Sequence, residues 1–432
     1  MKLNILLICN KPNSKRDAAT IVDHIEAFEH YSEHTIWICS NLGNLPPKLD
    51  LNKFDVVIIH YSICLFVDHY LSRSAKQQLR DYNGLKIVFI QDEYRRINQI
   101  IDEFAFLKLD VLFTCFPDKE MGRVYTEQAL PDLSKYNNLT GYIPASLIRQ
   151  TKLPIPIRKR KVHVGYRGRK IPFWLGELSY EKYDIVDKWA TFTKHSGLIT
   201  DISCKEQDRI YGANWVDFLS SCKATLGVES GASVMDFTGE LEKTVELHQL
   251  NHPEDTFYDV QNQYLSAHEG QYKLNQISPR CFEAIALKTV LVLYEGEYSG
   301  LLVPDRHYIM LKKDFSNIDD VLARLRDDDY LQQMANRAYD EVALNPENSY
   351  QCFIEKVDKI INHEFKSRGK SRVLSHYTKA SFKRLFIPVW FKNKYYHYRT
   401  ALYQKIPVKV RRMLKPIYYG VVNLRRSKRD KG

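Results

Sequence analysis

The sequence of 432 residues lacks the patterns that mark secreted, zinc-binding and membrane-spanning proteins. Its eight cysteines form no C-x-x-C pair and most lie within apolar runs, which predicts reduced core thiols and not a disulfide framework or a zinc site. No stretch approaches the roughly 20 apolar residues of a membrane span. The apolar run at 5–9 is short and has no small-residue cleavage site after it, so it predicts a β-strand and not a signal peptide. We therefore expect a cytoplasmic protein.

Several nucleotide and metal motifs are also absent. The first expected strand is followed by NKPNSKRDAAT, which contains no Gly-rich loop, and this disfavours a Rossmann oxidoreductase. A Walker A sequence is missing too, which disfavours a P-loop NTPase. No H-E-x-x-H, paired D-x-D or Cys/His cluster occurs, so tight metal binding is not indicated. We expect neither a metal nor a cofactor.

The positive charge is concentrated at one end of the chain. The composition is ordinary for a globular protein, with 44% hydrophobic and 27% charged residues, and the formal net charge is +11. Residues 366–432 contain 20 Lys and Arg but only one acid, Asp430, and this leaves 43 basic and 51 acidic residues in the rest. The sequence therefore predicts an acidic globular part followed by a strongly basic tail.

The order of predicted elements indicates two α/β domains. Short apolar strands such as FDVVIIHYS and LKIVFIQ alternate with amphipathic helices over residues 1–148, which predicts a doubly wound parallel sheet. The basic, Pro-rich segment 151–161 is typical of a linker. A second α/β pattern places another domain at 149–347, followed by a closing helix at 348–365 and the basic tail at 366–432. Two such domains facing each other would form a cleft at the carboxyl ends of their strands, where ligands bind in open sheets.

The stretch ISPRCFEAIALKTVLVLYEG, residues 277–296, carries the strongest functional signal. Ser278 suits the position before a helix, and Pro279 suits its first turn. Free N–H groups at that helix start favour a phosphate, and Arg280 would add a bidentate donor. Glu283 lies one turn further on, where it can accept hydrogen bonds from a ribose diol. The alternative, a capped helix with a capping-side acid at Glu283, has about even weight.

This stretch, with VPDRHYIMLKKDFSNIDDVL after it, resembles the C-terminal domain of group 1 glycosyltransferases of the GT-B fold, and specifically the subgroup with a PR-x-FEA motif. The resemblance implies two Rossmann-like domains facing a cleft, with Glu283 on the ribose of a sugar nucleotide. It also implies a metal-independent enzyme, because Arg, Lys and a helix dipole neutralise the leaving diphosphate. Many relatives carry a second acid eight residues before this Glu, and here that position is Asn275.

Two further loops fit a donor site. VGYRGRK, residues 164–170, offers Arg167 and Arg169 beside glycines, and the resemblance implies a diphosphate-contacting loop, although a basic surface turn is a close alternative. LGVESGASVMDFTGE, residues 226–240, supplies Glu229 and Ser230, which the resemblance places along the donor site. The acids Asp236 and Glu240 in the same stretch are expected to be ordinary helix-start residues.

The first domain offers candidates for a base. Asp92 and Glu93 follow the strand FIQ directly, at the rim of the expected cleft, where a carboxylate can take the proton of an acceptor hydroxyl. A capping role for the next helix is equally consistent with their position. His60, after an earlier strand, ranks below Asp92, because lone histidines are more often structural.

The tail interleaves its cations with 11 Phe, Trp and Tyr residues. Cations with interfacial aromatics suit an anionic membrane surface, and this reading is favoured over a disordered solubilising tail. Nucleic acid would also attract the charge but is the weakest of the three readings.

Together these features predict a glycosyltransferase of polysaccharide or surface-glycan synthesis. It would move a sugar from a nucleotide-sugar donor to a hydroxyl of a glycan or lipid-linked acceptor, as a peripheral protein on the inner face of the membrane. We expect no nucleic-acid partner. Two alternatives stay open, a sugar-nucleotide epimerase and a non-catalytic scaffold that kept the GT-B fold. Asn275 is the residue that most favours the scaffold.

Overall fold

The protein is described here from a computed structural model, which covers residues 1–12, 19–149 and 155–387. Most of them, 1–44 and 51–374, belong to one compact unit that contains two parallel β-sheets. This confirms the predicted pair of doubly wound α/β sheets. Residues 45–50 and 375–387 belong to a second, small unit, in which Tyr377 accepts a hydrogen bond from the backbone N–H of Asp50 and donates one to the carbonyl of Lys48.

The first sheet has six parallel strands in the order β2-β1-β3-β4-β5-β6. Every residue of β1 is buried, as expected for a strand covered on both faces. The strands are β1 (Asn4–Cys9), β2 (Thr35–Ser40), β3 (Val56–Ile59), β4 (Leu85–Phe89), β5 (Val111–Thr114) and β6 (Ser134–Asn137). The helices between them are α1 (Ala19–Tyr31), α2 (Arg73–Asp81), α3 (Ile97–Leu107) and α4 (Asp118–Val124), with α5 (Ala145–Ile148) after β6.

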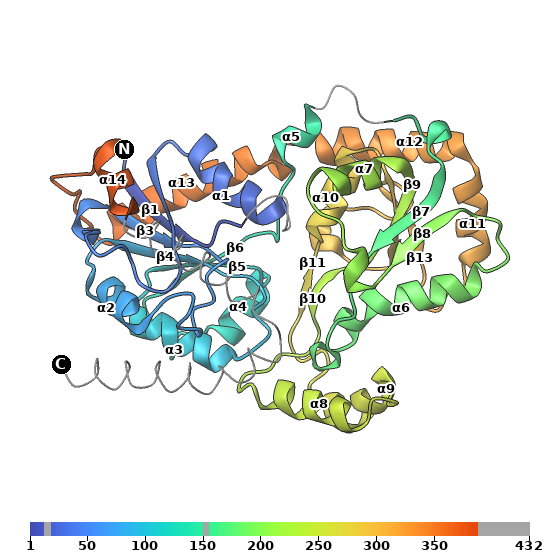
Figure 1. The fold of residues 1–432 in the computed structure, drawn as a ribbon, viewed down its shortest axis with the longest axis horizontal. Helices are drawn as coiled ribbons and strands as arrows, with labels where there is room; N and C mark the ends of the chain where they lie inside the picture. The colour runs from blue at the N-terminus through green and yellow to red at the C-terminus, as the bar shows by residue number, and fades with distance from the viewer. Residues whose placement is uncertain (13–18, 150–154, 388–432) are drawn as a thin grey trace, which may run out of the picture. The chain divides into compact units, whose positions relative to one another are not determined.

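The closing helix α13 (Tyr350–Ser367) returns to this first sheet. The Ser349 hydroxyl caps it by accepting a hydrogen bond from the N–H of Cys352. Its apolar stripe, which includes Phe353 and Val357, packs with α1 against alternate residues of β1 such as Ile5. Figure 1 shows α13 and α1 together on one side of the sheet, with α2 and α3 on the other.

The second sheet has five parallel strands in the order β13-β12-β9-β7-β8. They are β7 (Val162–Arg167), β8 (Thr200–Ser203), β9 (Cys222–Gly227), β12 (Val290–Tyr294) and β13 (Tyr308–Leu311). The helices are α6 (Glu177–Phe192), α7 (Ala213–Ser221), α10 (Pro279–Ala286), α11 (Ile318–Arg326) and α12 (Asp328–Ala338). Alternate residues of β12 face opposite layers: Val292 packs into the cluster of α6 and α12, whereas Leu293 packs against α10.

A long excursion leaves the second sheet after β9. It starts and ends with a short antiparallel pair, β10 (Ser230–Ala232) and β11 (Leu274–Gln276), and carries α8 (Glu240–Asn251) and α9 (Phe257–Val260). The last described helix of the chain, α14 (Lys379–Leu385), belongs to the small second unit. No helix in the described ranges combines the length and apolar character that crossing a membrane requires.

The expected linker ends in a buried arginine. Arg160 is only 3% exposed, and its guanidinium donates to the carbonyls of Cys222 and Leu287 at 2.8 and 3.0 Å and to the hydroxyl of Thr289 at 2.7 Å. Cys222 and Leu287 are the C-terminal cap residues of α7 and α10. One cation therefore fixes the ends of two neighbouring helices, where the helix dipoles favour positive charge.

Candidate functional site

A cavity of about 780 Å³ lies at the carboxyl ends of strands from both sheets. Its walls include Ser62 after β3, Asp92 after β4 and Gly168 after β7, and the N-terminus of α10 contributes Ser278. This is where open parallel sheets bind ligands. The volume lies within the range of pockets that bind small molecules and cofactors.

The charged groups on the cavity walls are mostly cationic. Among the described residues that line it there are only two carboxylates, Asp92 and Glu283. The cations are Arg95, Arg167, Arg169, Lys182, Arg209 and Arg280. This excess of positive charge favours an anionic ligand.

Three of these cations are already committed to protein partners. Arg167 forms an ion pair with Asp201 at 2.7 Å and donates to three backbone carbonyls, so it holds the end of β7. Arg95 pairs with Glu242, and Arg209 pairs with Glu206 at 2.8 Å. Arg167 lines the cavity, but most of its guanidinium N–H groups are already bonded within the protein.

The other three cations are available to a ligand. Arg169 and Arg280 are exposed, and Arg169 has no hydrogen bond or ion pair within the described ranges. The Arg280 guanidinium uses one nitrogen to donate to the carbonyl of Arg167. Burial and, to a smaller extent, the nearby charges of Arg280 and Arg169 lower the pKa of Lys182 to about 8 against the opposing charge of Asp92. Lys182 lies in the second turn of α6, and no sequence motif had pointed to it.

The start of α10 has the predicted form. Ser278 occupies the N-cap position and Pro279 the first turn. The Ser278 side chain makes no capping hydrogen bond, and it lines the cavity. Its hydroxyl and the helix N-terminus are therefore both directed to the region where the free cations gather.

Glu283 also lines the cavity, one turn into α10. Its Oε2 accepts a hydrogen bond of 2.7 Å from the indole N–H of Trp215. Burial raises the pKa of the carboxyl, while the Trp215 hydrogen bond and the Arg280 charge oppose that rise. Trp215 is a site residue that the sequence patterns had not indicated.

Of the predicted pair Glu229 and Ser230, at the start of β10, only Ser230 lines the cavity. Glu229 is 5% exposed and is not among the residues that line the cavity. It accepts hydrogen bonds from the N–H groups of Glu297 and Tyr298 at 3.2 and 2.8 Å, and from the Asn275 amide at 2.9 Å. Glu229 thus anchors the loop after β12.

The two predicted bases, Asp92 and Glu93, differ in their access to the cavity. Asp92 lines the cavity, with a φ of +57° and a 2.8 Å hydrogen bond from the Tyr94 hydroxyl. Glu93 is fully buried and accepts from Thr114, Tyr125 and the N–H of Cys115, so it faces the core. Burial raises the pKa of Glu93 to about 7, and the three hydrogen bonds oppose that rise.

His60 does not reach the cavity either. It is fully buried, and its Nε2 lies 3.0 Å from Nδ1 of His24, which is also fully buried. Burial lowers the pKa of both imidazoles. A histidine in this environment is a neutral core residue, and Asp92 is the predicted base that lines the cavity.

Two polar groups on the walls have no partner. The Trp174 indole N–H and the Tyr61 hydroxyl are buried without a hydrogen bond to any part of the chain that the structure describes. Unpaired buried donors are uncommon in native proteins. A ligand in this cavity can satisfy them.

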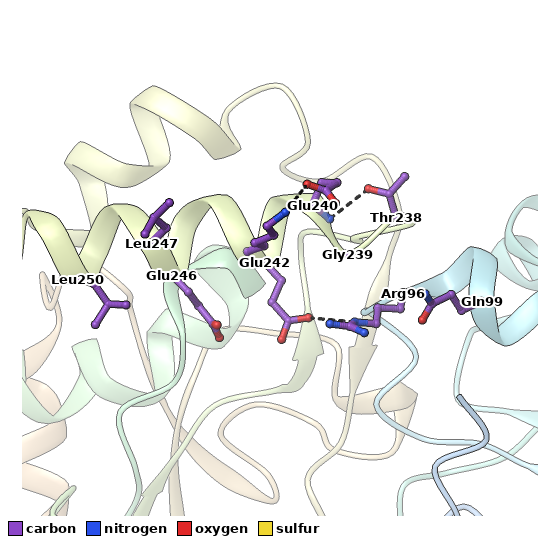
Figure 2. A pocket seen from close by; sticks show the side chains of 10 residues that line it. Arg96, Gln99, Thr238, Gly239, Glu240, Glu242, Glu246, Leu247 and Leu250 are labelled. Atoms are coloured by element: carbon purple, nitrogen blue, oxygen red, sulfur yellow. Dashed lines mark hydrogen bonds and ion pairs between the residues drawn. The ribbon is translucent and has the colours of Figure 1, made fainter. Parts of the chain in front are cut away.

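A second hollow of about 420 Å³ lies along α8 (Figure 2). Glu242 extends from α8 towards Arg96, and it also binds Arg95. Asp236 caps the start of α8 through the N–H groups of Gly239 and Glu242, as expected for a helix-start acid. Three carboxylates, Glu240, Glu242 and Glu246, line this hollow with only two cations, Arg96 and Lys243, so it is less suited to an anion than the larger cavity.

No family model and no curated protein matches the chain. Among solved structures, it is similar to an alpha-glucosyltransferase in complex with UDP and a 13-mer DNA, with a TM-score of 0.53, 11% identity, and coverage of 84% of this chain and 99% of that one. The chain has the GT-B fold. HepE of Anabaena in complex with UDP-glucose has a TM-score of 0.40, 9% identity and coverage of 85% and 99%. Trehalose-6-phosphate synthase OtsA has a TM-score of 0.41, 10% identity and coverage of 83% and 99%.

The free cations predict binding of inorganic pyrophosphate. Saturating pyrophosphate at about 100 times its dissociation constant should stabilise the wild type by about 2.7 kcal/mol. The stabilisation should shrink in Arg169→Ala and Arg280→Ala, and it should persist in Arg158→Ala, whose exposed side chain faces Asp329 at 3.5 Å outside the cavity. Thermal unfolding measures the effect, and equal shifts in all four proteins would contradict the assignment.

Proposed function

We propose that this protein is a glycosyltransferase, of the group with a PR-x-FEA motif, that moves a sugar from a nucleotide-sugar donor to an acceptor hydroxyl. One observation carries the proposal: Arg169, Lys182 and Arg280 gather around the start of α10, one turn before Glu283, in a cavity lined by both sheets. These groups suit a diphosphate next to a ribose. The similar alpha-glucosyltransferase binds UDP, which agrees with this arrangement.

The diphosphate would be held by Arg169, Lys182, Arg280 and the Ser278 hydroxyl. Charge-assisted hydrogen bonds of this kind contribute about 1.5–3 kcal/mol each. Arg167 would act indirectly, because its carbonyl accepts the Arg280 guanidinium. Glu283 would bind the ribose hydroxyls. No cofactor or metal is required in this scheme, since fixed cations and the helix N-terminus stabilise the charge of the leaving diphosphate.

Asp92 would serve the acceptor. In the transfer, the acceptor oxygen forms a bond to the anomeric carbon of the donor while its proton passes to the Asp92 carboxylate. The bond between that carbon and the diphosphate oxygen breaks, and its electron pair leaves with the diphosphate. Asp92 lies near Lys182, whose pKa its charge raises, so acceptor and donor groups face the same space.

The acceptor would be a glycan or a lipid-linked glycan in polysaccharide or surface-glycan synthesis. The wall near Asp92 offers neutral polar and aromatic groups, among them Tyr61, Gln91 and Trp174, which suit a sugar ring. Arg95, whose guanidinium lies 6.0 Å from the Trp174 ring, is already paired with Glu242. This pairing argues against nucleic acid as the acceptor, although the similar alpha-glucosyltransferase is bound to DNA.

The basic tail would bring the protein to an anionic membrane surface on the cytoplasmic side. Its described part includes the exposed cations Lys379, Lys383 and Arg384 on α14, and Ile387 is 51% exposed beside them. The remaining residues of the predicted tail, 388–432, lie outside the described residues. Each cation near such a surface contributes about 1 kcal/mol.

The donor site predicts selective stabilisation by one nucleotide or sugar nucleotide. In a panel that covers the common bases, one should add about 2.7 kcal/mol at 100 times its dissociation constant. Glu283→Ala should lose most of this shift, and Glu240→Ala, on the exposed first turn of α8, should keep it. Thermal unfolding is the measurement. If no member of the panel shifts the wild type, the non-catalytic scaffold becomes the better explanation.

The acceptor base predicts a loss of turnover without a loss of donor binding. Asp92→Asn should lower kcat about 10²- to 10⁴-fold, the usual range for a general base, while the dissociation constant of the donor stays unchanged. Sugar transfer to a saccharide acceptor, followed with the donor that the panel identifies, is the measurement. Glu93→Gln serves as the comparison, because that side chain faces the core. Transfer at the wild-type rate in Asp92→Asn would refute the role.

The tail predicts salt-sensitive membrane binding. The full chain should sediment with vesicles that contain phosphatidylglycerol and not with phosphatidylcholine vesicles, and 0.5 M salt should release it, since salt screens exposed charges. Deletion of 388–432 should weaken sedimentation while the nucleotide-induced thermal shift is retained as a check of folding. Unchanged sedimentation after the deletion would remove the tail from this role.

A further inference from the structure

Two aromatic residues of α7 lie beneath the groups that define the donor site. Trp215 and Phe218, here called the aromatic platform, stack with ring centroids 5.7 Å apart and planes 25° apart. The Arg280 guanidinium lies 5.5 Å from the Trp215 ring, and that of Arg167 lies 4.4 Å from the Phe218 ring. Such cation–π contacts fix the direction of a guanidinium as well as attracting it.

The platform is fixed in place at both ends of α7. The helix starts after Gly212, which has a φ of +59°, a conformation that L side chains rarely adopt. It ends at Cys222, whose carbonyl accepts a hydrogen bond from the buried Arg160. Because Arg160 also holds Leu287 at the end of α10, the two helices keep a fixed relation in which Trp215 can reach Glu283.

Trp215 leaves Glu283 with one oxygen for a ligand. The indole N–H can only donate, and it donates to Oε2 of Glu283 at 2.7 Å. Within the described ranges, Oε1 of Glu283 has no hydrogen-bond partner. A donor to Oε2 therefore fixes the carboxylate plane and presents Oε1 as an acceptor inside the cavity.

We infer that Trp215 is a positioning residue that holds the Glu283 carboxylate for the hydroxyls of a ribonucleotide. The inference rests on the proposed function, since it assigns a role within the same donor site. A ribose offers hydroxyl donors at positions 2 and 3, and a carboxylate oxygen fixed in direction accepts from them. A nucleotide without these hydroxyls leaves the oriented carboxylate unpaired, so the site selects ribonucleotides over their dideoxy counterparts.

The test compares a nucleoside diphosphate with its 2′,3′-dideoxy counterpart, using the base that the nucleotide panel identifies. Isothermal titration calorimetry gives the ratio of the two dissociation constants for the wild type, Trp215→Phe, Glu283→Ala and the double variant. We expect the wild type to bind the ribonucleotide at least about tenfold more tightly, as hydrogen bonds to a charged group imply. Trp215→Phe removes the N–H and keeps an aromatic ring below Arg280, so the ratio should fall to about threefold or less with the dideoxy affinity little changed.

A matched control is Trp189→Phe. This residue of α6 is 1% exposed in the core, and its indole N–H has no partner in the described part of the chain. The same chemical change there should leave the ratio at the wild-type value. Trp215 is partly exposed, which favours folding of its variant, and Trp215→His provides a second variant that still carries a ring N–H donor and should recover part of the ratio.

The outcomes distinguish a failure of the positioning role of Trp215 from a failure of the proposed function. A wild-type ratio in Trp215→Phe, or an equal loss in Trp215→Phe and Trp189→Phe, would overturn the positioning role while leaving nucleotide binding intact. Additive effects of Trp215→Phe and Glu283→Ala in the double variant would also overturn it, because residues that act through each other are non-additive. Absence of nucleotide binding in the wild type would instead refute the proposed function.

Discussion

The candidate site depends on one buried guanidinium that lies behind it. Arg160 is withdrawn from solvent, and burial lowers its pKa to about 10, so it stays charged at neutral pH. Its hydrogen bonds satisfy the last carbonyls of α7 and α10 together, groups that would otherwise be unpaired at helix ends. The far ends of both helices are fixed by this contact. Their N-terminal turns, which carry Trp215 and Arg280, therefore meet at the cavity in a constant geometry.

Cationic groups lie on one part of the cavity wall, and Asp92 with neutral polar groups lies on another. Within the described residues, the cations of the cavity that form no ion pair, Arg169, Lys182 and Arg280, come from the domain of the second sheet, and Asp92 with neutral polar groups comes from that of the first. An anionic leaving group and a neutral acceptor need these two environments at a short distance from each other. Two ion pairs, Arg95 with Glu242 and Arg167 with Asp201, contribute to this separation. They neutralise cations whose charge would otherwise extend across the cavity.

The sequence predicted the fold and the helix at the centre of the site because both rest on local patterns. Apolar strands with helices between them indicated the two sheets, and Ser278-Pro279 marked the start of α10. Lys182 and Trp215 lie on ordinary amphipathic helices, and only the packing of α6 and α7 brings them to the cavity. Arg160 looked like one cation of a basic linker, since nothing in its neighbours reveals that two helix ends meet there.

Burial also explains why two of the three predicted bases, Glu93 and His60, do not line the cavity. His60 directly follows β3, and Asp92 and Glu93 both lie in the loop after β4, yet the side chains of His60 and Glu93 turn inward, meet the core and do not reach the cavity. The choice between inward and outward depends on the backbone at the strand end. Asp92 has a left-handed φ, a conformation that was not predictable from FIQDEYRR, and with it the chain turns between Asp92 and Glu93.

The uncharged side chain at position 275 is explained by its neighbours and does not require a loss of catalytic activity. Its amide donates to Oε2 of Glu229 at 2.9 Å, and Glu229 is committed to the N–H groups of Glu297 and Tyr298. A carboxylate at position 275 would place two negative charges side by side in a buried site, which would disfavour ionisation of one of them. An amide offers a donor of nearly the same shape without that repulsion. Given Glu229, an uncharged residue at 275 preserves the loop after β12.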